Sequence, residues 1–156
     1  MRRMLFVAAT LAMALAFAGP ALADFWIGTN DNDIKKGTEG ADTLIGRGGN
    51  DRLSGLGAID KISGNGGRDK LYGGDGADNT AGGSGGDLIV AGGGTDNIQG
   101  AAGDDTIYTG TKAEGNDGDS DEVRYGPGHD KVFLFGPDHA AHNLEARDVC
   151  EEITNY

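Results

Sequence analysis

Residues 73–81 read GGDGADNTA, and residues 82–90 read GGSGGDLIV. Both nine-residue units begin with two glycines and carry an aspartate at the sixth position. The eighth position holds Thr80 in the first unit and Ile89 in the second. Working outward in both directions, the aspartate recurs at intervals of nine without a slip. The row comprises Asp33, Asp42, Asp51, Asp60, Asp69, Asp78, Asp87, Asp96 and Asp105.

Two further rows follow the same period. The first position of each unit is glycine, with Ala91 as the exception, and the eighth is leucine or isoleucine except at Lys35 and Thr80. A disordered glycine-rich linker would contain glycine and aspartate with no fixed phase between them. Three rows locked to one period across residues 28–108 therefore indicate a folded repeat.

These units resemble the haemolysin-type calcium-binding nonapeptide repeat, also called RTX. The resemblance is specific over residues 28–108 and continues more loosely to about Glu151. It implies an all-β fold, a parallel β-roll or β-helix solenoid with two nonapeptides per turn and short N- and C-terminal caps. In each unit we expect a glycine-rich turn, with glycine supplying positive φ, and a very short strand around the inward aliphatic residue.

With two units per turn, each aspartate stacks on the one eighteen residues later, near the 4.7–4.9 Å strand spacing. One ladder runs from Asp33 to Asp105 and the other from Asp42 to Asp96. Stacked carboxylates repel unless a cation lies between them, and oxygen ligands in a flexible cage favour Ca2+. The resemblance implies that ions bind between successive turns, through these nine aspartates and backbone oxygens. The glycines expected at these sites are Gly46, Gly64, Gly73, Gly82 and Gly100.

The apolar row is too small to offset the entropy of ordering some eighty residues, and bare acidic ladders add repulsion. We therefore expect calcium binding and folding to be coupled. Ala58 and Ala91 replace glycines, which makes the sites at Asp60 and Asp96 the weakest candidates. Lys35 interrupts the inward row in the first unit, and Phe25 to Ile27 are expected to plug that end of the column.

The first 23 residues predict a secretory signal peptide, with basic Arg2 and Arg3, an apolar run from Leu5 to Phe17, and a small-x-small site at residues 21–23. The run is too short for a membrane span. We expect a secreted, extracellular protein starting at Asp24, with a net charge of −14 from 11 basic and 25 acidic side chains. Such a charge disfavours nucleic acid and leaves cations as the expected partners.

Residues 24–108 form the predicted repeat domain with its N-terminal cap, and residues 109–156 a polar loop, degenerate repeats and a C-terminal cap. The step from Asp105 to Asp121 is sixteen, so the phase breaks here. Asp117, Asp119 and Asp121 resemble the first half of an EF-hand calcium loop. The alternative interpretation is an acidic loop exposed to solvent. Residues 126–132 are interpreted as a degenerate repeat unit. The apolar run 132–135 is interpreted as part of the C-terminal cap.

Two smaller features of the C-terminal region leave alternatives open. The single cysteine, Cys150, has no internal partner and is either a buried thiol or an intermolecular bridge. Asp138, His139 and His142 form either a small metal site or an exposed cap loop.

The sequence argues against an enzyme. Residues 82–86 match the G-x-S-x-G nucleophile elbow around Ser84, but they occupy an ordinary repeat slot. The favoured function is a secreted calcium-binding module with a structural or binding role. A surface adhesin or matrix component is the alternative, and an ice-binding solenoid fits less well because the row after each aspartate is mixed and charged. The sequence names no protein or glycan partner.

Overall fold

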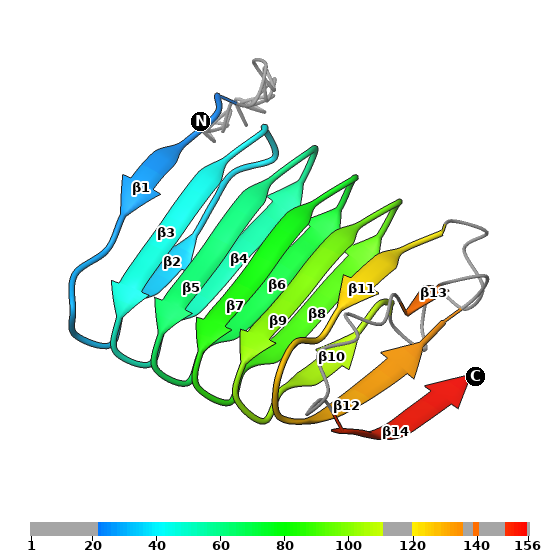
Figure 1. The fold of residues 1–156 in the computed structure, drawn as a ribbon. Helices are drawn as coiled ribbons and strands as arrows, with labels where there is room; N and C mark the ends of the chain where they lie inside the picture. Colours follow the sequence, from blue (N-terminus) through cyan, green and yellow to red (C-terminus); the bar gives the residue numbers. More distant parts are fainter. Residues whose placement is uncertain (1–21, 111–119, 136–138, 141–148, 156) are drawn as a thin grey trace, which may run out of the picture.

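The computed structural model describes residues 22–110, 120–135, 139–140 and 149–155, the last two ranges as backbone only. Among these residues every regular element is a β-strand, and none is a helix that could cross a membrane. The strands alternate between two parallel sheets that lie face to face, so the chain winds as a solenoid (Figure 1). This is the all-β parallel β-roll that the sequence predicts.

Sheet A contains the odd-numbered strands in chain order. They are β1 (Phe25–Ile27), β3 (Thr43–Gly48), β5 (Lys61–Gly66), β7 (Asn79–Ser84), β9 (Asn97–Ala102), β11 (Glu122–Arg124) and β13 (His139–Ala140). Sheet B contains the even-numbered strands. They are β2 (Ile34–Lys36), β4 (Arg52–Gly57), β6 (Lys70–Asp75), β8 (Leu88–Gly93), β10 (Thr106–Tyr108), β12 (His129–Leu134) and β14 (Val149–Asn155).

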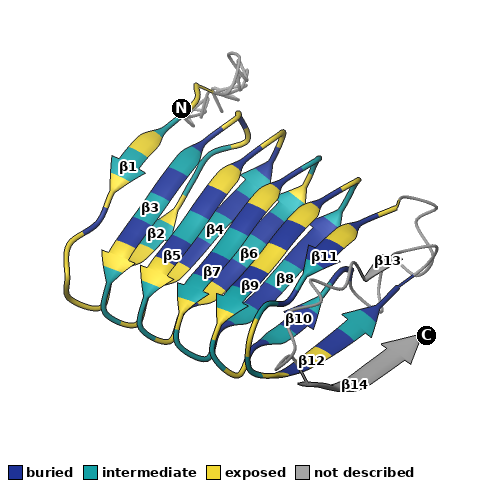
Figure 2. Cartoon of the chain, viewed as in Figure 1, coloured by how far each residue is buried: buried dark blue, intermediate teal, exposed yellow. Residues whose placement is uncertain are grey.

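The register confirms two repeat units per turn. Leu44 pairs with Ile62 in sheet A and Leu53 with Leu71 in sheet B, each pair eighteen residues apart. The inward row forms a single-file core between the sheets, visible as dark bands in Figure 2. Its fully buried members are Leu44, Leu53, Ile62, Leu71, Ile89, Ile98, Ile107, Val123 and Val132. Thr80 lies in the same row and is equally buried.

The strands are longer than expected. From β3 to β9 each covers six residues and takes in the first glycine of the following unit, which the sequence analysis assigned to the turn. The left-handed conformations lie one and three residues further on, as at Gly83 (φ 118°) and Gly85 (φ 124°). The first glycine of each unit is therefore part of the strand, and the expectation of positive φ at that row was wrong.

The N-terminal end differs from a simple plug. β1 pairs with β3 as the outermost strand of sheet A, and Trp26 packs against the core beside Leu44. Phe25 and Ile27 face solvent instead of covering the column. Across from Trp26, Lys35 forms an ion pair with Asp24, which places its charge at the rim of the core.

Candidate metal centres along two aspartate ladders

The aspartates of the repeat lie at the two corners where the chain enters a strand. At each corner the Oδ1 of one aspartate accepts the backbone N–H of the aspartate one turn earlier. The aspartate side chain thus accepts a backbone N–H at the corner, just before the strand begins. The donor–acceptor pairs, at 2.7–2.8 Å, are 33–51, 51–69, 69–87 and 87–105 on one side and 42–60, 60–78 and 78–96 on the other.

Both ladders extend beyond the regular repeats. Asp121 accepts the N–H of Asp96 at 2.7 Å, and Asp130 accepts that of Asp105 at 2.8 Å. Each step is 25 residues instead of 18, because the loop around residues 111–119 adds seven residues to one turn. The sequence analysis counted the spacing of Asp121 from Asp105, which belongs to the other ladder. It therefore did not place Asp121 in the ladder of Asp96. The signal was present: Asp121 and Asp130 are nine apart, and each precedes an inward valine by two residues.

The second carboxylate oxygens have no hydrogen-bond partner at six positions. The Oδ2 atoms concerned are buried and belong to Asp51, Asp60, Asp69, Asp78, Asp87 and Asp105. A buried carboxylate oxygen without a partner costs free energy that a cation can recover. The unpartnered oxygens therefore mark these six residues as the strongest candidates for metal ligands.

Burial also changes the acidity of these carboxyl groups. Desolvation is the main cause, and the neighbouring aspartates of the ladder add to it, so the pKa of Asp60 and of Asp87 rises to about 6. The pKa of Asp105 rises to about 7 for the same reasons. The pKa values of Asp51, Asp69 and Asp78 are also raised, with desolvation first. Burial in the ladders thus shifts these carboxyl groups towards the protonated form.

The first glycine of each unit leaves room for these oxygens. A Cβ added to Gly64 would collide with Oδ2 of Asp69 and lie 2.8 Å from the carbonyl oxygen of Gly82. A carboxylate oxygen and a backbone oxygen of the next turn thus converge on the space beside each such glycine. The same arrangement occurs at Gly46, Gly73, Gly82 and Gly100, and also at Gly28, Gly37 and Gly55, which the sequence analysis did not name as metal-site glycines.

The first turn satisfies its carboxylates differently. Oδ2 of Asp33 accepts the N–H of Thr29 at 2.7 Å and its hydroxyl at 3.0 Å. Oδ2 of Asp42 likewise accepts the N–H and the hydroxyl of Thr38. In this turn, protein groups donate hydrogen bonds to the Oδ2 atoms, whereas the equivalent Oδ2 atoms of the six aspartates named above have no hydrogen-bond partner. The sequence analysis counted Asp33 and Asp42 among the metal ligands without setting them apart, and the threonine signal lies four residues before each of these two.

The oxygen set fits Ca2+. In the described part of the chain no three acidic, histidine or cysteine side chains converge on one point, so two carboxylates are the most that one gap offers. Backbone carbonyls must complete any shell, and the carbonyls beside Gly64 and its equivalents are in place to do so. Neutral and anionic oxygens in a loop-built cage suit a hard cation that tolerates irregular coordination.

Two units depart from this pattern. Ala91 takes the place of the first glycine in the unit of Asp96 and is fully buried, so its Cβ fills the space beside that carboxylate. Ala58 lies at a different position, in the left-handed region with φ 68°, and the glycine cradle of Asp60 at Gly55 is intact. The structure therefore gives no reason to set Asp60 apart on account of Ala58, and the weakness of the site at Asp96 remains a prediction.

The structure describes few of the remaining candidate site residues from the sequence analysis. Asp121 belongs to a ladder, while Asp117 and Asp119, its partners in the EF-hand interpretation, lie outside the described residues. The same is true of Asp138 and His142, and of the side chains of His139 and Cys150. Residues 1–21, most of the predicted signal peptide, also lie outside the described residues. Ser84 ends β7 and leads into a turn to β8, not into a helix.

Comparison with known proteins agrees with the geometry. The family model of the RTX calcium-binding nonapeptide repeat, which comprises four copies, matches residues 27–60, 54–89 and 81–111. Together these segments cover more than half of the chain. Searches of curated proteins and of solved structures give no match.

Proposed function

Because the chain belongs to the RTX calcium-binding nonapeptide-repeat family, we propose that it is an exported calcium-binding module whose folding depends on calcium. It is a calcium-binding protein with a β-roll fold, and such folds are typically structural. The observation that carries the proposal is the row of buried Oδ2 atoms without hydrogen-bond partners.

The proposed ligands are the aspartates whose oxygens lack protein donors. In the first ladder these are Asp51, Asp69, Asp87 and Asp105, which bound three gaps. In the second, Asp60 and Asp78 bound the best-formed gap, since Ala91 crowds the next one. Carbonyl oxygens of Gly64, Gly82 and their equivalents would complete each shell. Asp33 and Asp42, whose oxygens are held by threonines, are proposed to end the column of sites without binding an ion.

Calcium would supply the positive charge that the corners lack. The residues at each corner align the carboxylates through Oδ1 and leave Oδ2 facing a backbone carbonyl. In an apolar, partly desolvated setting, unneutralised carboxylates oppose folding. The narrow core, one aliphatic residue per strand, has little surplus stability with which to offset that cost. Folding is therefore expected to be weak until the ions bind.

The proposal also includes export of the protein and the limits of its domains. Residues 1–23 would direct export, residues 24–108 would form the repeat domain, and the strands after Ser120 would close its far end. RTX repeats typically occur in secreted or extracellular proteins, where calcium is abundant. The alternative, a role as a surface adhesin or matrix component, gains from a surface feature described in the next subsection.

Circular dichroism of the chain from Asp24 tests the coupling. We expect little β-structure in chelator and a cooperative gain as calcium reaches the range of about 0.1–1 mM that extracellular modules use. Magnesium should substitute poorly, because it requires a smaller octahedral shell. Equal spectra in calcium and in chelator would show that the ladders do not need an ion to fold.

A further inference from the structure

The outer face of sheet B carries positive charge on an acidic protein. In each strand of this sheet, the two residues that flank the inward residue point away from the core. Across β2 to β12 these flanking positions include four basic side chains and no acidic one, although the whole chain has a net charge of −12. The basic residues are Lys36, Arg52, Lys70 and Lys131, all exposed.

Aromatic rings lie beside these charges. Tyr72, Val90, Tyr108 and Phe133 are neighbours in register on successive strands of sheet B. The rings of Tyr108 and Phe133 stack with centroids 4.5 Å apart and an angle of 7°. The guanidinium of Arg52 lies 4.9 Å from the ring centre of Tyr72. We call these aromatic and basic residues together the basic face.

The basic face borders two hollows along one corner of the solenoid. One is lined by the cations Arg52, Arg68 and Lys70, with Asn32, Ile34, Asn50 and the ladder residues Asp33 and Asp51. The other continues from Arg68 and Lys70 to Leu88 and Thr106, with Gly86, the ladder residues Asp69 and Asp87, and Asp104. Arg68 and Lys70 are common to both, so the cations lie where the hollows meet. The ladder aspartates of the hollows, apart from Asp33, would be neutralised by the proposed calcium ions. Asp104, which is exposed, accepts the backbone N–H of His129 and is the one lining carboxylate outside the ladders.

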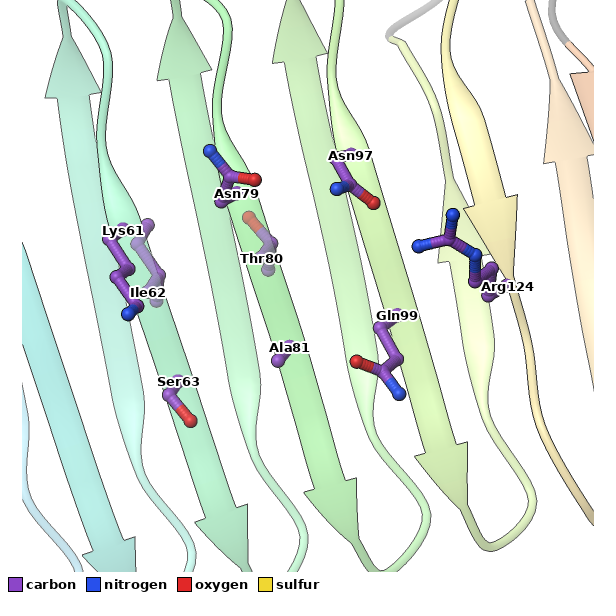
Figure 3. Close-up of a pocket in the computed structure, with 9 residues that line it drawn as sticks. All are labelled: Lys61, Ile62, Ser63, Asn79, Thr80, Ala81, Asn97, Gln99 and Arg124. Atoms are coloured by element: carbon purple, nitrogen blue, oxygen red, sulfur yellow. The ribbon is translucent and has the colours of Figure 1, made fainter.

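Sheet A provides the contrast. Its hollow is lined mainly by the amides Asn79, Asn97 and Gln99, with one basic residue towards each end (Figure 3). Of these two cations, Arg124 is paired with Glu122 on the same strand. The other, Lys61, occupies the same position in its repeat unit as Lys70 does on sheet B. The two sheets thus share a backbone design and differ in the charge that they display.

We propose that the basic face binds an acidic polysaccharide, a polymer with carboxylates at intervals and hydroxyls between them. Arg52 and Lys70 lie on neighbouring strands, about 5 Å apart along the sheet, and Lys131 lies three strands further, roughly 15 Å away. A single small anion cannot span that distance, whereas an extended polymer can. The hydroxyls of Tyr72, Tyr108 and Thr106 lie along the same strands and can bond sugar hydroxyls.

The aromatic geometry favours a glycan over single-stranded nucleic acid. Proteins that bind single strands offer open ring faces on which bases stack. Here Tyr108 and Phe133 cover one face of each other, and Arg52 covers a face of Tyr72. The edges and hydroxyls remain, and these suit hydrogen bonding.

Binding to carboxymethyl-dextran, with unmodified dextran of the same length as the neutral control, tests this inference. The chain from Asp24 is used in millimolar calcium at low ionic strength. We expect binding to the carboxylated polymer alone, weakened by added salt. Lys70→Gln should reduce affinity about two- to fivefold, the range of an exposed ion pair. Lys61→Gln, the matched change on sheet A, should leave affinity unchanged, and Lys70→Arg should retain it.

This inference rests on the proposed function only in requiring a folded sheet. The calcium-induced β-signal of each variant is measured in the same samples, so a failure to fold is separated from a failure to bind. Equal losses from Lys70→Gln and Lys61→Gln would overturn the proposal. So would equal binding of neutral dextran by the folded chain, or tighter binding of oligothymidylate than of carboxymethyl-dextran.

Discussion

At the scale of single residues, Thr80 stands out in the core. It lies between Ile62 and Ile98 on neighbouring strands, in the row that holds leucine or isoleucine in most units. Its exposed fraction is 2%, and its hydroxyl has no hydrogen-bond partner. A buried hydroxyl without a partner costs roughly 1–3 kcal/mol. The structure gives no compensating contact for it.

We therefore expect Thr80→Val to stabilise the protein by about 1–3 kcal/mol, because the hydroxyl is replaced by a methyl group of similar size. Urea unfolding in saturating calcium measures the change. Thr43→Val, at a half-exposed position on the outer face of sheet A, is the matched control and should have little effect. Destabilisation by Thr80→Val would show that the hydroxyl has a partner, such as a water molecule.

The ladder aspartates differ in what they bind. Oδ2 of Asp69 is buried and lacks a partner, whereas Oδ2 of Asp33 accepts two hydrogen bonds from Thr29. We expect Asp69→Asn to raise the calcium midpoint severalfold and to reduce the number of bound ions, because Asp69 borders two gaps. Asp33→Asn should leave the number of bound ions unchanged.

Calcium titration followed by circular dichroism, with the bound metal counted by equilibrium dialysis, distinguishes the two variants. An equal shift of the midpoint for both would contradict the assignment of the first turn as a metal-free end. The prediction does not depend on which backbone carbonyls complete the shell. It depends only on which carboxylates already have protein donors.

At the scale of elements, the strands after the loop continue the solenoid. Val123 of β11 pairs with Ile98, and Val132 of β12 pairs with Ile107, so the core row gains two more residues. Tyr125, Leu134 and Phe135 are buried next to them. The segment is thus built as further turns of the column, and its role as a C-terminal cap remains a prediction.

Deleting residues 123–156 should expose the edges of β9 and β10 together with Ile98 and Ile107. Open parallel edges pair with other chains, so we expect weaker calcium-induced folding or end-to-end association. Dichroism and light scattering at several protein concentrations measure both effects. A truncated chain that stays monomeric with an unchanged calcium midpoint would show that the cap is dispensable.

At the scale of the whole molecule, acid should partly replace calcium. The pKa of Asp60 and of Asp87 is raised to about 6 and that of Asp105 to about 7, from 3.8. A carboxyl with a higher pKa in the folded chain takes up protons on folding. Its contribution to stability is full below the unfolded pKa of 3.8 and is lost as the pH rises through 6 to 7.

In chelator, we therefore expect more β-structure at about pH 4.5 than at about pH 8. In calcium, protons compete with the ion, so the calcium midpoint should rise as the pH falls below about 7. Dichroism at matched ionic strength checks both trends. A calcium-free chain equally unfolded at both pH values would indicate that repulsion elsewhere on this acidic protein outweighs the ladders.

The sequence by itself determined the repeat and its period. Aspartate and aliphatic rows at intervals of nine are local patterns, and the alternation of inside and outside residues along a strand marks the inward row from Leu44 to Ile107. The pairing of units eighteen residues apart, and with it the stacking of Asp51 on Asp69, was implied by the family resemblance, and the structure shows it. The step of sixteen from Asp105 to Asp121 equals one nine-residue unit plus seven residues, so Asp121 joins the opposite ladder. Comparing that step with the eighteen-residue stacking distance concealed this.

Only the tertiary structure decided which polar atoms have partners. The same aspartate at the same repeat position has a bonded Oδ2 at Asp33 and an unpartnered one at Asp69, because the donors come from Thr29 in one unit and are missing in the other. Likewise, the first glycine of each unit is required by the approach of a carboxylate and of a carbonyl one turn away. The carbonyl contacts join residues at least eighteen apart in the chain. Thr29 lies only four residues before Asp33, so the threonine is visible in the sequence, but only the structure shows that its N–H and hydroxyl reach Oδ2.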